Sequence, residues 1–132
     1  MSKQIIIPPT LPPPRGFNHG ILTEGGRILW LAGQDASDAD GKIVAPGDMV
    51  AQYEQVLKNL QAVVEAAGGT MQDIVKLNIY TTDRVLYKAN LKAFGRLMKA
   101  CFGEYYPVMA LFEVVGLFQD EALVEMEGVG VL

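Results

Sequence analysis

Apolar residues along the chain recur with two different periods, and each change of period marks the end of a predicted element. Between positions 49 and 67 they return every three or four residues, which predicts a helix with one buried face. Asp48 precedes this segment as a candidate N-cap, and Gly68-Gly69 follows it as a stop signal. The apolar positions of this helix are Met49, Val50, Tyr53, Val56, Leu57, Leu60, Val63 and Val64.

Residues 74–81 alternate with a period of two instead, which predicts a half-buried strand. One side of this strand carries Ile74, Lys76, Asn78 and Tyr80, and the other carries Val75, Leu77, Ile79 and Thr81.

Shorter apolar runs predict four more strands, at 17–23, 27–34, 108–117 and 122–131. Glu24-Gly25-Gly26 is typical of a hairpin turn between the first two, and Gln119-Asp120-Glu121 of a turn between the last two. Residues 35–47 are rich in Asp, Gly and Ala and predict a loop. A second helix is expected from Asp83 to about Phe102, where Gly103 stops it.

The resulting order, β-β-α-β-α-β-β, predicts an α+β fold with one mixed sheet and both helices on one face. Residues 1–16 stand apart as a proline-rich N-terminal arm that holds five of the seven prolines. Because proline lacks a backbone donor, this arm is expected to be an extended strap on the domain or on a neighbour, and not a helix or an inner strand. Residues 17–132 are expected to form a single domain.

The face of this sheet opposite the helices is expected to be polar in a monomer. In the last strand Val124 and Met126 alternate with Glu125 and Glu127, but the strands keep apolar or small residues on much of both faces. An exposed apolar sheet of that size usually marks a subunit interface, so we expect an oligomer.

Composition narrows the classes of partner. The net charge is −4 and no basic cluster occurs, which argues against nucleic acid and favours a small molecule or a protein. A single cysteine, Cys101, and the absence of a signal-like or membrane-length apolar run indicate a cytoplasmic protein. No phosphate-binding glycine motif is present, and one histidine far from one cysteine makes no metal site, so no cofactor or metal is expected.

Several segments, in one order, resemble the RidA (YjgF) family of imine/enamine deaminases across residues 17–131. They are RILWLAGQ at 27–34, the helix with Gln52, Asn59, Leu60 and EAAGG at 65–69, DIVKLNIYTTD at 73–83, Asn90 with Phe94, Tyr106-Pro107, and VEMEGVGV at 124–131. The resemblance implies a chorismate-mutase-like fold and a homotrimer. In it three sheets pack into a central barrel, and substrate clefts lie between subunits.

One departure from the family pattern concerns the chemistry directly. The family's deaminases carry Pro-Ala-Arg at the start of the fourth strand of the domain, where the arginine holds a substrate carboxylate, but this chain reads Pro107-Val108-Met109. Met109 carries no charge, and no other arginine stands at a matching position. Arg15 in the arm could in principle reach a cleft, although a solvated surface arginine is the favoured interpretation.

The remaining candidate site residues follow from the resemblance. His19, the only histidine, and Glu125, which matches the family's cleft glutamate, are the predicted catalytic residues. Glu127 shares the face of Glu125, so the two carboxylates are expected roughly 7 Å apart, where burial raises at least one pKa. The predicted substrate-binding residues are Phe17, Asn90, Met109, Phe112 and Glu127.

His19 is expected to act as a base or hydrogen-bond partner, and Met109 with Phe112 as an apolar wall. Asn90 either bonds backbone at the cleft rim or caps local structure. Trp30 and Tyr106 are assigned to core packing.

Two functions remain open. One is a cofactor-free hydrolase acting on an enamine, an imine or a related small metabolite, with a preference altered by Met109. The other is a non-catalytic trimer that binds a metabolite or a protein. RNA cleavage, claimed for some relatives, fits poorly with an acidic chain.

Overall fold

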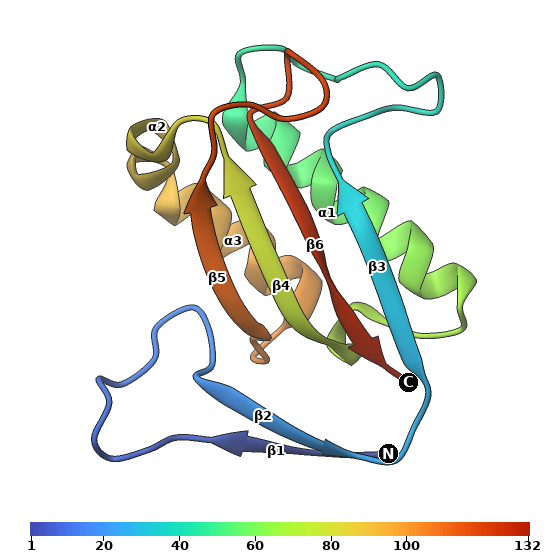
Figure 1. Ribbon diagram of the computed structural model, residues 1–132, viewed down its shortest axis with the longest axis vertical. Coiled ribbons are helices and arrows are strands. Elements are labelled where there is room, and N and C mark those ends of the chain that lie inside the picture. Colours follow the sequence, from blue (N-terminus) through green and yellow to red (C-terminus); the bar gives the residue numbers. More distant parts are fainter.

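The computed structural model describes residues 1–132, and its main body is a four-stranded sheet with helices on one face (Figure 1). The strand order is β3-β6-β4-β5, in which β4 and β5 run parallel and β6 runs antiparallel to both of its neighbours. This mixed sheet confirms the predicted class. Its strands are β3 (Ile28–Gln34), β4 (Ile74–Thr81), β5 (Val108–Glu113) and β6 (Val124–Val131).

The helices pack their apolar stripes against the sheet and form one core. Helix α1 (Met49–Ala66) begins at Asp48, whose carboxylate accepts a hydrogen bond from the Ala51 N–H, as its N-cap role predicts. Val56, Leu60 and Val64 of this helix are fully buried. Helix α3 (Leu91–Phe102) joins the core through an aromatic stack of Phe94 on Tyr53, with ring centroids 4.1 Å apart.

The second predicted helix is interrupted at Asn90. It consists of the short helix α2 (Arg84–Ala89) followed by α3, and Asn90 ends one and begins the other. The Asn90 side chain donates to the Leu86 carbonyl oxygen at 2.9 Å, which satisfies a carbonyl at the end of α2. Gly103, with φ 68°, ends α3 as predicted.

The predicted hairpin between 17–23 and 27–34 is wrong. Strand β2 (Gly20–Glu24) pairs with β1 (Ser2–Ile6), a strand that the sequence did not predict, in a separate two-stranded sheet that extends away from the main body (Figure 1). Gly25 and Gly26 do make a turn with positive φ, but it directs β3 to the C-terminal strand. Arg27 and Leu132 exchange two backbone hydrogen bonds, of 2.8 and 2.9 Å, just beyond this pairing.

Other boundaries shift by a few residues. The strand predicted over 108–117 ends at Glu113, and the one predicted over 122–131 begins at Val124. In β4 the predicted alternation holds for Leu77, Ile79 and Thr81, which are buried. Ile74 is also buried, because the register with β6 shifts between Ile74 and Lys76 and turns it to the helix side.

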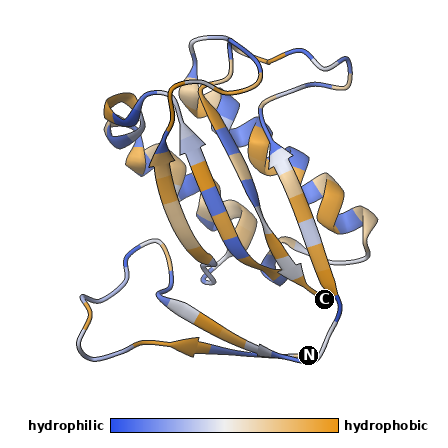
Figure 2. Ribbon diagram, in the orientation of Figure 1, coloured by the Kyte–Doolittle hydropathy of each residue, from blue (hydrophilic) through white to orange (hydrophobic).

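Polar and apolar residues alternate along β4 and β6 (Figure 2), and polar ones such as Asn78 and Glu127 lie on the sheet face without helices. This face also carries Trp30, which is 74% exposed, so its assignment to the core is wrong for the single chain. We call this surface the open face. None of the helices has both the length and the apolar composition that a membrane span requires.

Candidate functional site

A cluster of polar side chains lies at the middle of the open face, where β6 and β4 pair. The register places Glu127 opposite Asn78 and Glu125 opposite Tyr80. The Tyr80 hydroxyl donates to Glu127 Oε1 at 2.6 Å, and the Asn78 amide lies 3.5 Å from the same oxygen. The hydrogen bond to Glu127 is the main cause of a raised pKa at Tyr80. Glu127 is thus held in one orientation by two neighbours.

Glu125 lies one step further along this face, against β3. The backbone of Gly33 approaches it so closely that a Cβ at this glycine would lie 2.5 Å from Glu125 Oε2. Desolvation, and then the charges of Asp35 and Glu127, raise the pKa of the Glu125 carboxyl. The two carboxylates therefore lie on one face, and burial favours the protonated form of Glu125.

A cavity of about 390 Å³ lies on the other side of the sheet, between the β5 edge and α3. Eleven of its fourteen lining residues are hydrophobic. Met109 faces this cavity, because it pairs with the buried Leu77 in the parallel β4–β5 ladder and shares its side. The lining includes Phe17, Tyr87, Phe94, Met98, Tyr106 and Met109. We call this space the β5–α3 cavity.

The segment before β2 closes one side of this cavity. The Asn18 side chain donates to the Tyr106 carbonyl oxygen at 2.6 Å, and its backbone N–H donates to the Pro107 carbonyl oxygen at 3.1 Å. His19 Nε2 lies 2.7 Å from the Pro12 carbonyl oxygen, and its ring packs edge-on against Phe17 at 5.2 Å between centroids. These contacts attach the arm to the start of β5.

The structure divides the predicted site residues between two places. Phe17 and Met109 line the β5–α3 cavity, whereas Phe112 stacks on Tyr80 on the open face with centroids 5.6 Å apart. The expected apolar wall of Met109 and Phe112 is therefore wrong within one chain. The two residues are three positions apart on β5, and residues at an odd spacing on a strand point to opposite faces of the sheet.

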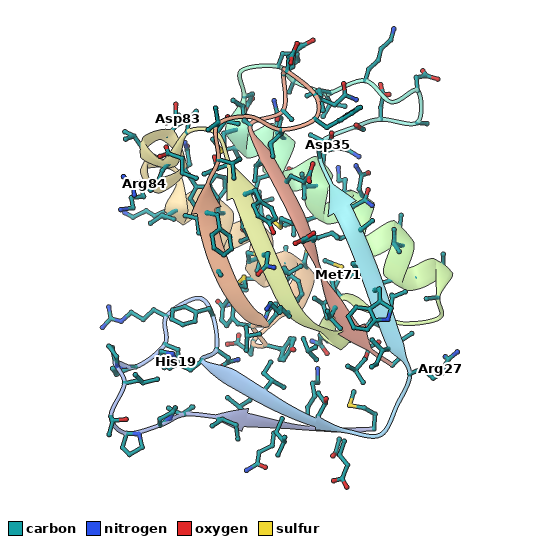
Figure 3. The ribbon with its side chains drawn as sticks, viewed as in Figure 1. His19, Arg27, Asp35, Met71, Asp83 and Arg84 are labelled. Carbon is teal, nitrogen blue, oxygen red and sulfur yellow. The ribbon has the colours of Figure 1, made fainter.

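His19 and Glu125 are also separated within one chain. His19 lies beside the start of β2, at the opposite end of the sheet from Asp35, whose charge acts on Glu125 (Figure 3). Asn90 does not line the β5–α3 cavity, and its side chain is occupied by the helix junction. Tyr106 lines the cavity rather than serving the core alone.

Three residues that contribute to these two regions were not among the predicted site residues. Tyr80 and Asn78 belong to the carboxylate cluster, and the alternation of β4 already placed them on one side of the strand. Their partner strand was not identified, so the contact with Glu127 was not foreseeable. Arg15 lines the β5–α3 cavity, and only the docking of the arm on β5 reveals this.

The fold and these two regions define an α+β protein with an acidic open sheet face and, on the other side of the sheet, an apolar cavity at its edge. Residues 10–132 match the family described as Endoribonuclease L-PSP. A RutC family protein of Pyrococcus abyssi (strain GE5 / Orsay) is 30% identical over 133 residues, covering 98% of this chain and 97% of that protein. The chain belongs to this family, which is the RidA (YjgF) family that the sequence resembles.

Solved structures agree with this assignment. YyfB of Yersinia pestis, a protein of unknown function in the conserved Rid family, superposes over the full length of both chains with a TM-score of 0.89 and 36% identity. YyfA of the same organism gives 0.69 and 31%, covering 99% of this chain and 100% of that one. RidA of the Antarctic bacterium Psychrobacter sp. PAMC 21119 gives 0.69 and 27%, covering 98% and 99%.

Proposed function

We propose that the protein is a cytoplasmic, cofactor-free hydrolase that converts a small imine or enamine into the carbonyl compound and ammonia. The observation that carries the proposal is the carboxylate pair on the open face, with Glu125 protonating more readily than an ordinary glutamate and Glu127 fixed by Tyr80. A base whose pKa moves toward the working pH is suited to accept a proton from water.

The proposed reaction needs only water and proton transfer. Glu125 accepts a proton from a water molecule as the water oxygen forms a bond to the imine carbon. Glu125 returns this proton to the nitrogen, which gives a carbinolamine. The carbinolamine hydroxyl then loses its proton, which Glu125 passes to the nitrogen, as the carbon–oxygen double bond forms, the carbon–nitrogen bond breaks and ammonia leaves. No electrons are transferred, and one imine plus one water gives one carbonyl compound plus one ammonia.

We further propose that the working site is shared between copies of the chain. Within one copy the carboxylate pair and the β5–α3 cavity lie on opposite sides of the sheet, while β5 is an edge strand. The proposed assembly is a closed homotrimer with the open faces inward, arranged so that the β5 edge of one copy lies against the open face of the next. The open face supports such an assembly because it exposes Trp30 and Phe112, which are 74% and 46% exposed.

Mixing inactive variants tests both parts of this proposal. Imines made in situ from a panel of amino acids serve as substrates, and ammonia release is the readout. Glu125→Gln and Phe17→Glu are each expected to lose turnover, the first at the carboxylate pair and the second at the cavity. Co-expressed, they should regain about a quarter of the wild-type activity, because random trimers contain interfaces with both halves intact.

A mixture that stays inactive while trimers form would show that the site does not span two copies. Full activity in Glu125→Gln would show that the Glu125 carboxylate is not the base.

The alternative is a binding module without turnover, and Met109 is the observation that favours it. An apolar side chain there removes the bidentate carboxylate contact that the resemblance assigns to this position. Saturable binding of small acids, with no acceleration of hydrolysis across the whole imine panel, would establish this alternative. RNA cleavage, the activity in the family's description, is not proposed, because the chain is acidic and has no basic cluster.

A further inference from the structure

We infer that Arg15 binds the carboxylate of a small apolar acid in the β5–α3 cavity, and so takes over the role of the arginine that Met109 replaces. The inference rests on the proposed function for the choice of an imino acid as substrate. The binding site itself depends only on the cavity and its lining.

Arg15 is the only charged residue among the fourteen that line the cavity. Apart from it and two glycines, the lining is apolar or aromatic. A space of about 390 Å³ with apolar walls and one cation fits a ligand that has an apolar body and one negative group. Aromatic or branched monocarboxylates have this chemistry, whereas small polar acids would leave the walls without contacts.

The guanidinium of Arg15 has no partner within the protein. The two salt bridges join Lys58 to Glu54 and Lys99 to Glu104, and none of the side-chain hydrogen bonds involves Arg15. A guanidinium has five N–H donors in a planar fork that matches a carboxylate. Arg15 is therefore free to bind one.

Hydrogen bonds hold the backbone next to Arg15 in place, so the Arg15 side chain extends from a fixed position beside the cavity. Three residues after it, Asn18 makes two hydrogen bonds to the segment that leads into β5, through the Tyr106 and Pro107 carbonyls. His19 fastens the other end of the same loop to Pro12. Because Met109 lies on β5 two residues after Pro107, Arg15 and Met109 line one cavity from two elements.

In this chain the cation of the cavity comes from the arm, and position 109 on β5 is apolar. An arginine at position 109 would enter through the floor of the cavity from β5. Arg15 is an exposed residue that lines the cavity from the arm on one side. The two placements predict the same kind of ligand, an anion, with the carboxylate shifted toward the arm.

The test compares two probes that differ by one charge, phenylacetate and its neutral amide phenylacetamide. Binding is followed by NMR of ¹³C-methyl methionine in the full chain, because Met98 and Met109 both line the cavity and Met109→Leu assigns one of the signals. Wild-type protein should bind phenylacetate with shifts at the Met109 methyl.

Arg15→Gln should weaken phenylacetate binding about tenfold or more, which is the loss of one charge-assisted contact, and leave phenylacetamide unchanged. Arg27→Gln is the matched control, since it removes the same charge just before the start of β3 (Figure 3), outside the cavity lining. Arg15→Gln combined with Met109→Arg should recover phenylacetate binding, because both side chains reach one cavity.

Equal phenylacetate affinity in Arg15→Gln and wild type would overturn the inference, as would wild-type binding without any shift at Met109. Failure of the proposed function is a separate result. Charge-dependent binding at Arg15 without any turnover would contradict the proposed hydrolase and support the carboxylate site. Turnover with an unchanged KM in Arg15→Gln would contradict the carboxylate site and support the hydrolase.

Discussion

Gln52 offers the sharpest test of how this fold holds its site. It is a fully buried amide in α1 that makes three hydrogen bonds to backbone groups. Its Nε2 donates to the Ala45 and Glu121 carbonyl oxygens at 3.2 and 3.1 Å, and its Oε1 accepts from the Leu123 N–H at 2.8 Å. Leu123 directly precedes β6, so Gln52 fixes the start of the strand that carries Glu125.

The magnitude follows from these three contacts. Each net hydrogen bond contributes about 1 kcal/mol, and a buried backbone group left without a partner costs about 1–3 kcal/mol. Gln52→Leu replaces the amide with an apolar side chain of similar size and so removes all three hydrogen bonds. Some of the loss is regained from apolar burial, so we expect a net decrease of about 3 kcal/mol in the free energy of unfolding. In a chain of this length that lowers Tm by about 10 °C.

The assay is thermal unfolding followed by circular dichroism at equal protein concentrations, because assembly also raises the apparent stability. Gln61→Leu is the matched control, since Gln61 lies in the same helix but hydrogen-bonds only to the exposed Glu65, at 2.7 Å. That control should change Tm by less than about 2 °C, as expected for an exposed side-chain pair. Equal Tm values for the two variants would refute the reasoning that buried amide contacts anchor β6.

Three further outcomes are expected. Gly33→Ala should reduce turnover while leaving Tm nearly unchanged, because the new methyl group would displace the flexible carboxylate of Glu125. Turnover equal to that of the wild type in Gly33→Ala would show that Glu125 is free to move. Because the pKa of Glu125 is raised in the folded chain, its ionised form costs stability above that pKa, so Glu125→Gln should raise Tm near pH 8. The gain should vanish as the pH falls below about 4.3, and a constant gain would contradict the sign. Trp30→Lys should shift any assembly toward monomer, since it places a charge on the open face, and analytical ultracentrifugation measures this shift. An unchanged sedimentation coefficient would exclude the open face as the interface.

The local pattern of the sequence determined most of the elements. The stripe from Met49 to Val64, with Asp48 before it and Gly68 after it, was sufficient to place α1, because a helix of that amphipathic period has one stable packing. The alternation in 74–81 likewise placed β4 and its two sides. The carboxylate pair followed from the period of two in β6, which puts Glu125 and Glu127 on one face whatever the partner strand is.

Pairings between distant segments were decided by the tertiary structure. The turn at Gly25-Gly26 is compatible with a hairpin, yet β3 pairs with β6, and β2 pairs with a strand that precedes the prolines. Local sequence states which residues can turn or extend, but not which of several apolar strands becomes the partner, because that choice depends on the burial of the whole sheet.

The same distinction explains the site. The sequence by itself showed that the strand position of the family's arginine holds Met109, and it left Arg15 as one exposed cation in a proline-rich arm. Only the docking of Asn18 on the segment before β5 brought Arg15 to the cavity that Met109 lines, through contacts between residues 88 positions apart. Such a contact has no periodic signature in the chain, since it depends on two loops meeting in space.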